Sequence, residues 1–504
     1  MSQVKLNIIA NFAGKAWTAL MSLAFIPLYL KFLGIEAYGL IGFFATLQAL
    51  FGLLDLGLSS TLNRELARYS AQQGTGQKMR DLVRTLETIY WGMAILISVM
   101  VISLAPFIAE YWIKAENLSV ETVQQSVVLL GIAIAFQWPL SFYSGGLMGL
   151  QRQALYNVLS SGLATLRGVG AVLILWLVSP TIEAFFTWQV VISLLSTALI
   201  ALALWHSLPK GKRTAHFDKQ LLHSIWRFAA GMTAISVITL LLVQLDKILL
   251  SALLPLKMFG YYTLASVAAA ALSMFVGPIF TALFPKFSQL VALNDKKELT
   301  ALYHRSCQLM SVVILPAALV LAMFSYEVML LWTGDPITAK NTYWLVSLLV
   351  IGNALNGLMN LPYGLQLAYG WTKLAFYTNV VAVLLLVPML IVMVHYYDAI
   401  GAAIVWVTLN AGYVLISLQI MHHRLLKGEQ WRWYREDVGL PLVATLVVAG
   451  LGRWLLPADM SVSTTVAYIV GVSLATLIVT AMVTPQVRVW IKHYFYRWRI
   501  AYDS

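Results

Sequence analysis

The stretch "YGLIGFFATLQALFGLLDLGLSSTL", residues 38–62, indicates the class of fold because Asp55 is its single charged residue. A helix needs about 20 mostly apolar residues to cross the hydrocarbon core of a bilayer, and this run is long enough. Its apolar residues are continuous and do not alternate with polar ones, which is a poor fit to a strand of a porin-type barrel. The stretch therefore predicts a membrane-spanning helix.

The rest of the chain repeats this pattern. Of its 504 residues, 60% are hydrophobic and 11% are charged, whereas a soluble domain carries about 25% charged residues. The sequence therefore predicts an all-α polytopic membrane protein with about 14 transmembrane helices, and a soluble enzyme or a disordered chain is a poor fit. The predicted spans are residues 7–30, 38–62, 86–110, 124–149, 154–178, 182–206, 226–253, 258–284, 306–332, 342–367, 374–395, 399–421, 438–456 and 463–484.

Basic residues gather on one side of the predicted membrane. With the N-terminus inside, 25 Lys and Arg residues fall in inner segments, and the outer loops carry only Lys31, Lys114, Lys257 and Lys340. Because cytoplasmic loops are enriched in Lys and Arg, we expect an even number of spans and both termini in the cytoplasm. The first span lacks a cleavage pattern and is interpreted as uncleaved.

Two segments recur at an offset of 221 residues. "LGIEAYGL" at 33–40 pairs with "LPLKMFGY" at 254–261 and matches Gly39 with Gly260, while "GLQRQALYN" at 149–157 pairs with "GWTKLAFYT" at 370–378. A parallel repeat predicts two six-helix lobes with a substrate site between them. The predicted organisation is an N-lobe at 1–206, a cytoplasmic linker at 207–225, a C-lobe at 226–421, a cytoplasmic loop at 422–437, two further spans at 438–484 and a cytoplasmic amphipathic tail of basic and aromatic residues at 485–504.

Several charged and amide side chains lie inside the predicted spans, where they are costly and usually face a cavity or a partner. Asn11 and Lys15 lie one helical turn apart in the first span, in line with Thr18 and Ser22. We predict a water-accessible substrate cavity that is lined by Lys15, Arg167, Lys247, Asn11, Asn356 and Asn360.

Two acidic residues accompany these cations. Asp55 lies in the second span and Asp246 in the seventh, and we expect them to tune the charge of the cavity or to carry a coupling ion. An equally open alternative is structural, in which Lys15 pairs with Asp55 and holds the first two spans together.

Known catalytic patterns are absent from the sequence. It contains no G-x-x-x-x-G-K-[ST] motif and no H-E-x-x-H motif, and Cys307 is its single cysteine. The inner loops are too short for a catalytic domain, and the 33 basic residues belong mainly to loops between spans. We therefore expect that the protein is not an enzyme, that it has no metal, cofactor or nucleic-acid partner, and that a proton or sodium gradient is a candidate energy source.

The chain resembles Wzx-type polysaccharide flippases, which share a superfamily with lipid II flippases and multidrug and toxin extruders. The resemblance lies in the 6+6+2 arrangement of spans and in "FLGIEAYGL" at 32–40, "LLDLGLSSTLNREL" at 53–66 and "QLDKILLS" at 244–251. It implies a V-shaped pair of helical lobes around a central, often cationic cavity. It supplies no invariant set of site residues.

The resemblance implies that the protein moves undecaprenyl-diphosphate-linked oligosaccharides, such as O-antigen, capsule or exopolysaccharide units, across the bacterial inner membrane by alternating access. The expected partners are this lipid-linked substrate, membrane lipids, a polysaccharide polymerase and a chain-length regulator. Three alternatives stay open: a cation-coupled multidrug exporter, a lipid II flippase and a membrane-embedded glycosyltransferase or ligase. The last would need larger outer loops with acidic or histidine clusters.

Overall fold

The computed structural model describes residues 3–55, 57–211, 213–221, 244–457 and 460–489, and all of the named elements in this part are helices. The predicted all-α membrane fold is confirmed, since eleven helices in the described part are long and apolar enough to cross a membrane. The number of fourteen spans stays a prediction, because much of the predicted seventh span, residues 222–243, lies outside the described residues.

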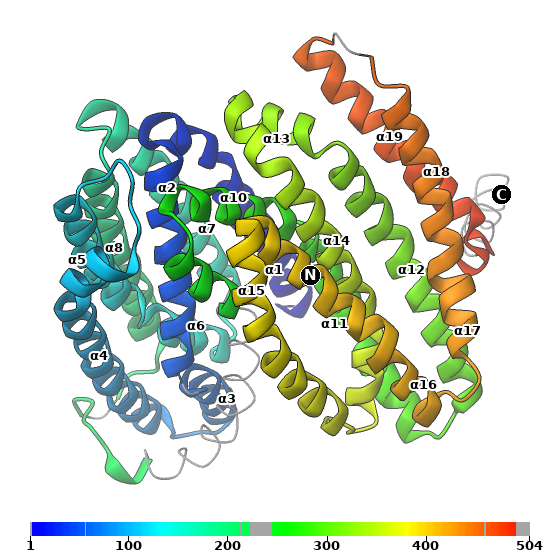
Figure 1. The fold of residues 1–504 in the computed structure, drawn as a ribbon. Coiled ribbons are helices and arrows are strands. Elements are labelled where there is room, and N and C mark those ends of the chain that lie inside the picture. The colour runs from blue at the N-terminus through cyan, green and yellow to red at the C-terminus, as the bar shows by residue number, and fades with distance from the viewer. Residues whose placement is uncertain (1–2, 56, 212, 222–243, 458–459, 490–504) are drawn as a thin grey trace, which may run out of the picture. The chain divides into compact units, whose positions relative to one another are not determined.

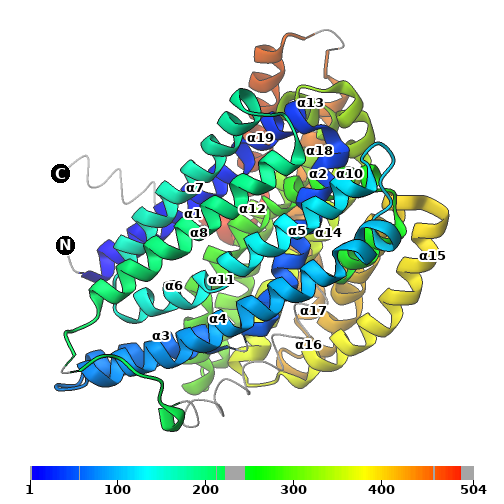
Figure 2. The ribbon, with the colours of Figure 1, turned by 90° about the vertical axis from the view of Figure 1, so that its left-hand side faces the viewer.

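The chain divides into two compact units, Met1–Gly260 and Tyr261–Ser504. Each unit is described by itself, and Figures 1 and 2 show their helices in two views. The division into lobes at 1–206 and 226–421 stays a prediction, and so does the expectation from the repeat that the two lobes superpose.

Unit 1 begins with a long helix and contains most of the elements that form the candidate site. Its elements in chain order are α1 (Gln3–Ala24), α2 (Ile26–Phe51), η1 (Gly52–Asp55), α3 (Leu58–Ser70), α4 (Gly76–Phe107), η2 (Ile108–Trp112), α5 (Val120–Gln137), α6 (Leu140–Gly149), α7 (Gln153–Leu177), α8 (Ile182–Ser207) and the start of α10 (Leu256–Ala270).

Within unit 1, α1 packs along α7, α5 packs between α4 and α8, and α3 packs against α6. Polar caps define where two of these helices begin. The side chains of Ser119 and Thr181 accept hydrogen bonds from backbone N–H groups in the first turns of α5 and α8. Such caps satisfy donors that have no partner inside the helix.

Unit 2 holds the remaining helices. They are α11 (Ser273–Ala292), α12 (Lys296–Met323), α13 (Ser325–Thr333), α14 (Pro336–Ala368), α15 (Lys373–Gly412), η3 (Tyr413–Ser417), α16 (Leu418–Leu425), α17 (Gln430–Arg432), η4 (Trp433–Gly439), α18 (Leu440–Trp454) and α19 (Val462–Val483).

The longest of these elements, α15, contains two helices that meet at a sharp turn. Asp398 leaves helical geometry with φ 48° and ψ −138°. A Cβ atom on Gly401 would lie 2.1 Å from the carbonyl oxygen of Met393, so the chain folds back on itself here. The segment Lys373–Leu425 therefore turns at the gap between the predicted spans 374–395 and 399–421, and their count as two spans stays a prediction.

The motif "GIEAYG" at 34–39 has a physical reason at three of its positions. Gly34 adopts φ 77°, which favours glycine, and breaks α2. The buried carboxylate of Glu36 accepts hydrogen bonds from the backbone N–H groups of Glu116 and Asn117, at 2.6 and 3.0 Å, and so fixes the loop before α5. Gly39 and Gly260 lie against each other in a close contact of backbones.

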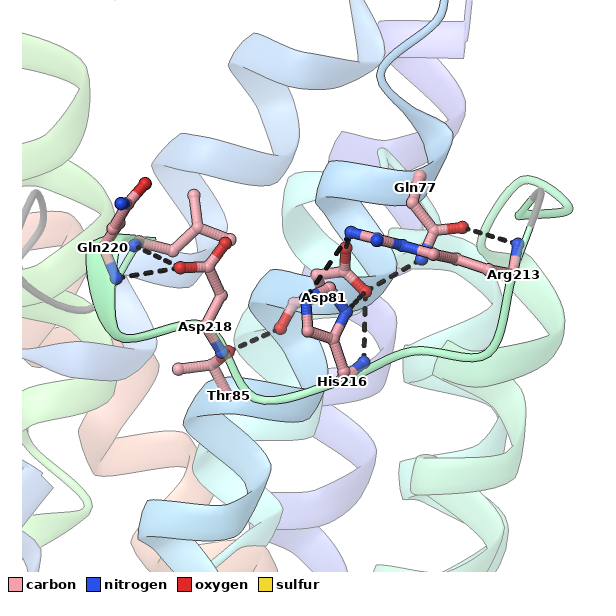
Figure 3. Close-up of polar contacts among 8 residues, drawn as sticks. Gln77, Asp81, Thr85, Arg213, His216, Asp218 and Gln220 are labelled. Atoms are coloured by element: carbon pink, nitrogen blue, oxygen red, sulfur yellow. Dashed lines mark hydrogen bonds and ion pairs between the residues drawn. The ribbon is translucent and has the colours of Figure 1, made fainter.

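The segment that follows α8 is attached to the first turns of α4, as Figure 3 shows. The buried Asp81 carboxylate accepts from the backbone N–H of His216 at 3.1 Å and lies 3.0 Å from His216 Nδ1 and 3.5 Å from Arg213. The backbone N–H of Asp218 donates to the Thr85 hydroxyl at 2.8 Å. This part of the predicted linker, residues 207–225, is therefore held on unit 1.

A buried polar cluster joins α12 to the C-terminal elements of unit 2. His304 is fully buried, with Nδ1 2.6 Å from an oxygen of Asp437 and Nε2 3.0 Å from an oxygen of Glu429. Gln308 donates to the other Asp437 oxygen at 2.9 Å and accepts from the backbone N–H of Gln486. The two helices that the sequence places outside the repeat, α18 and α19, are thus anchored to the described helix α12.

Candidate functional site

A cavity of about 360 Å³ opens within unit 1 and contains a cationic side chain. Arg167 projects into it from α7, and Thr18 and Ser22 border it from α1. Tyr29 and Gln189 add a phenol from α2 and an amide from α8. Two residues of the polar face that the sequence predicts for the first span, Thr18 and Ser22, therefore border a cavity.

Arg167 has few partners for its charge. One guanidinium nitrogen, Nη1, donates to the side-chain oxygen of Gln137 at 3.3 Å, and no carboxylate of a described residue lies within ion-pair distance. The Arg167 backbone is fixed independently, because the Trp188 indole donates to its carbonyl at 3.0 Å. A half-buried cation with a single neutral partner in the described structure is suited to receive a negative charge from a ligand.

A second cavity of about 510 Å³ adjoins the first. The two share Gln137, Leu140 and Tyr156, and the second is also lined by Asp55 and Ser144. Together they place a cation and a carboxylate in the walls of adjoining hollows. Hydroxyl and amide groups lie between the two charges.

Asp55 is held by neighbouring hydroxyl groups. The phenol of Tyr90 donates a short hydrogen bond to Oδ1, and the hydroxyls of Ser59 and Ser141 donate at 2.8 and 3.4 Å. Gly57, two residues later, adopts φ 70° directly before the first residue of α3, which gives a physical reason for the glycine in "DLGL". Lys15 forms no ion pair with Asp55 among the described side chains, so this structure does not contain the pair that the structural alternative requires.

The predicted site residues on α1 have different surroundings. Asn11 exchanges hydrogen bonds with α7, donating to Gln153 at 3.0 Å and accepting from Asn157 at 2.6 Å. Lys15 is exposed and lies one turn before Thr18, but it borders neither cavity. The structure thus places Asn11 in a contact between helices and leaves Lys15 at the surface of unit 1.

Asp246 and Lys247 lie directly after the residues that the structure does not describe. Both are half-buried, and neither borders the two cavities of unit 1. Their predicted role in the cavity stays a prediction.

Asn356 and Asn360 lie on α14 in unit 2. Asn356 donates to the side-chain oxygen of Asn410 at 2.9 Å, and Asn360 donates to the backbone carbonyl of Asn356 at 3.1 Å. Asn353, one turn earlier, accepts from the Trp406 indole at 2.9 Å. These amides form a polar contact between α14 and α15, and the structure does not test their contact with a substrate.

Three polar side chains of the site were not predicted as substrate-binding residues. Gln137 is shared by the two cavities, Gln189 lines the first, and Tyr90 bonds to Asp55. An amide side chain within a span is the sequence pattern that indicates Gln137 and Gln189, but amides that only pack helices together give the same pattern. No local pattern indicates Tyr90, because its contact with Asp55 joins residues 35 positions apart. Among the described residues, no group of three His, Cys, Asp or Glu side chains is arranged to hold a metal ion.

Solved structures of other proteins share the fold of this chain. A structure described as lipid II flippase MurJ in an inward closed conformation aligns with a TM-score of 0.72 and 12% identity, over 95% of this chain and 98% of that one. An inward-facing multidrug resistance MATE family transporter of the MOP superfamily aligns with a TM-score of 0.67 and 14% identity, over 81% and 94%. At these identities the likeness establishes the fold, which agrees with the superfamily that the motifs indicate.

Sequence relatives give the family. A Shigella flexneri protein described as an O-antigen transporter is 22% identical over 407 residues, which are 81% of this chain and 94% of that protein. The Escherichia coli lipopolysaccharide biosynthesis protein WzxC is 26% identical over 238 residues, 46% and 47% of the two chains. The sequence profile of the family described as "Polysaccharide biosynthesis protein" matches residues 4–291, more than half of the chain. The chain therefore belongs to the polysaccharide biosynthesis protein family.

Proposed function

We propose that this protein moves lipid-linked oligosaccharide repeat units across the bacterial inner membrane, as a flippase that alternates between two access states. The observation that carries the proposal is the Arg167 guanidinium in a cavity of unit 1, with a neutral amide as its described side-chain partner. The family and the relative described as an O-antigen transporter support the same substrate class.

The chemistry of such a substrate matches the two adjoining cavities. An undecaprenyl diphosphate carries negative charge that cannot enter hydrocarbon without a large desolvation cost. Arg167 offers up to five N–H donors in a planar fork, which suits phosphate oxygens. The hydroxyls and amides around Gln137 and Ser144 offer donors and acceptors to sugar hydroxyls. We propose that the prenyl chain stays in lipid while this head group passes.

Other polar residues are assigned supporting roles in this proposal. Lys15 and Lys247 extend the cationic path for the diphosphate, and Asn11, Asn356 and Asn360 hydrogen-bond sugar hydroxyls when the helices that hold them separate. These roles rest on the residue types and their positions in spans.

Asp55 is the proposed site of ion coupling, because its carboxylate borders a cavity and is surrounded by hydroxyl groups. It would bind H⁺ or Na⁺ during transport, and Asp246 is the second candidate. A carboxylate that binds an ion in one state of the transport cycle and releases it in another is a common feature of ion-driven transporters.

The topology of the protein follows from its charge distribution. We propose that both termini lie in the cytoplasm and that a polysaccharide polymerase and a chain-length regulator receive the product on the other face. Reporter fusions at Leu118 and Ala339 should then read external, and fusions at Gln73 and Asp295 internal. An external reading at Asp295 would contradict the proposed orientation.

The proposed activity can be tested in proteoliposomes that contain the purified full-length chain and a fluorescent undecaprenyl-diphosphate oligosaccharide. Outward movement is measured as the fraction of label that a membrane-impermeant quencher reaches with time. Faster movement than in protein-free liposomes is expected. Movement of a cationic dye or of lipid II, with no movement of the oligosaccharide lipid, would instead support the multidrug or lipid II alternative.

A further inference from the structure

A basic hollow of about 760 Å³ lies on unit 2, at the end of α16. The residues that line it are distant in sequence from those that line the two cavities of unit 1. Its walls include Trp371, Ile420, Arg424, Lys427 and Gln430. The aromatic and aliphatic walls provide apolar surface, while Arg424 and Lys427 provide two positive charges. None of these residues takes part in the proposed transport cavity.

The two cations of this hollow have no described counter-charge. Arg424 stacks on Trp371, with its guanidinium carbon 4.4 Å from the ring centroid. No carboxylate in the described part of the chain lies within ion-pair distance of Arg424 or Lys427. Glu429, in the same loop, instead contacts His304 at 3.0 Å and Arg432 at 3.6 Å. Both charges are therefore available to an anion.

The position of the hollow fixes the depth at which a ligand would bind. Arg424 lies at the end of the span segment Lys373–Leu425, and Gln430 begins the next candidate span. Trp371 lies in the loop between the candidate spans Pro336–Ala368 and Lys373–Leu425. Both loops between helices are four residues long, and they adjoin the apolar spans predicted at 342–367, 374–395, 399–421 and 438–456, so we infer that the hollow lies next to the inner surface of the membrane. Phospholipid headgroups occupy this depth.

A second feature of the hollow calls for a hydrogen-bond donor. Gln430 lines the hollow, and its side-chain oxygen Oε1 is buried and has no hydrogen-bond partner among the described residues. A buried acceptor without a donor is unfavourable. Attraction of cations to the C-terminus of α16 would explain Arg424 and Lys427, but it leaves this oxygen unexplained.

We propose that this hollow binds the headgroup of an anionic phospholipid that carries a free hydroxyl, of the phosphatidylglycerol type. The phosphate contacts Arg424 and Lys427, and the Gln430 amide turns toward the hollow so that Oε1 accepts a hydrogen bond from a glycerol hydroxyl. The acyl chains remain in the bilayer beside Ile420. A headgroup with an added positive charge, such as ethanolamine, would be repelled by the two cations, which favours the glycerol headgroup.

Native mass spectrometry of the purified full-length protein, titrated with phosphatidylglycerol, measures this binding directly. R424Q/K427Q should raise the apparent Kd about 30-fold, the equivalent of about 1 kcal/mol for each cation near a membrane surface. The matched control K296Q/K297Q removes two exposed lysines from another loop of unit 2 and should leave the Kd unchanged.

Q430A tests the hydroxyl contact and keeps both cations. It should weaken binding of phosphatidylglycerol but not of phosphatidic acid, which has a phosphate and no headgroup hydroxyl. This comparison also decides the question if R424Q/K427Q does not fold.

Four results would overturn the proposal. The first is wild-type affinity for phosphatidylglycerol in a folded R424Q/K427Q protein. The second is equal weakening of both lipids in Q430A. The third is an equal loss of affinity in K296Q/K297Q, which would show a general effect of charge. The fourth is displacement of phosphatidylglycerol by an equimolar amount of undecaprenyl diphosphate, which would assign the hollow to the transported lipid.

Discussion

Replacement of Arg167 by glutamine separates a role in transport from a role in folding. The Arg167 guanidinium makes one hydrogen bond to a described side chain, at 3.3 Å to Gln137, and has no carboxylate partner in the described structure. Glutamine keeps a polar side chain that can reach the same cavity but removes the charge. We expect R167Q to fold and to lose transport.

The magnitude follows from two opposing contributions to the free energy of unfolding. An arginine at the centre of a membrane helix costs about 2.5–3.5 kcal/mol on insertion scales. A hydrogen bond to a charged group contributes about 1.5–3 kcal/mol, and the 3.3 Å contact belongs at the lower end. R167Q removes both the cost of the buried charge and its hydrogen bond. The free energy of unfolding of R167Q should therefore lie within about 2 kcal/mol of the wild-type value, on the more stable side.

R167Q should weaken substrate binding, and this loss should be larger than its small gain in stability. Loss of one charged hydrogen bond to the diphosphate corresponds to about a 10- to 150-fold weaker Kd. R167K should fall between the wild type and R167Q, because lysine keeps the charge but not the planar fork of donors. R152Q is the matched control, since Arg152 is exposed at the start of the same helix.

Two measurements on each variant check this reasoning. Thermal unfolding in detergent, followed by tryptophan fluorescence, gives stability, and restoration of surface polysaccharide in a strain without its own flippase gives transport. A strong loss of both stability and abundance in R167Q, with recovery in R167K, would show that the charge holds the fold. Full transport by a stable R167Q protein would remove Arg167 from the substrate path.

Three further contacts that shape the two units are tested by substitution and thermal unfolding. G260A should destabilise unit 1 by about 1–3 kcal/mol, because its Cβ would lie 2.4 Å from a backbone carbonyl oxygen. In the control G162A, the added Cβ meets nothing within 4 Å, so this change should be neutral or stabilising. Equal effects of the two changes on stability would refute the contact at Gly260. E36Q should cost about 1.5–3 kcal/mol, since its carboxylate accepts two backbone N–H groups, and unchanged stability would show that the loop does not need the charge. H304L should cost more than D437N, because leucine leaves the carboxylates of Asp437 and Glu429 without their shared partner, whereas asparagine keeps a side-chain oxygen beside His304; the reverse order would refute this account of the cluster.

The sequence predicts the helical class and most of the span positions because both depend on local properties. The length of an apolar run decides whether a helix can cross the membrane, and the run is visible without any tertiary contact. The turn at Asp398 is predicted in the same way, as a gap between the spans at 374–395 and 399–421. The motif around Glu36 is visible as a pattern, but its reason is a contact with Asn117, 81 residues away.

The site is harder to predict because a polar side chain in a span can be satisfied in two ways. Asn11 is costly in hydrocarbon by itself, but Asn157 on α7 satisfies it, and this partner cannot be identified from the sequence of α1. Tyr90 was not predicted for the same reason, since it meets Asp55 only after α4 packs in the fold.

Charge distinguishes the two cases better than polarity does. An amide can be satisfied by another amide on a neighbouring helix, so its presence in a span is compatible with simple packing. A cation needs a carboxylate, water or an anionic ligand, and carboxylates are few within the spans of this chain. Arg167 borders a cavity and has no carboxylate partner among the described residues, so its retention in α7 is better explained by a transported anion than by helix packing.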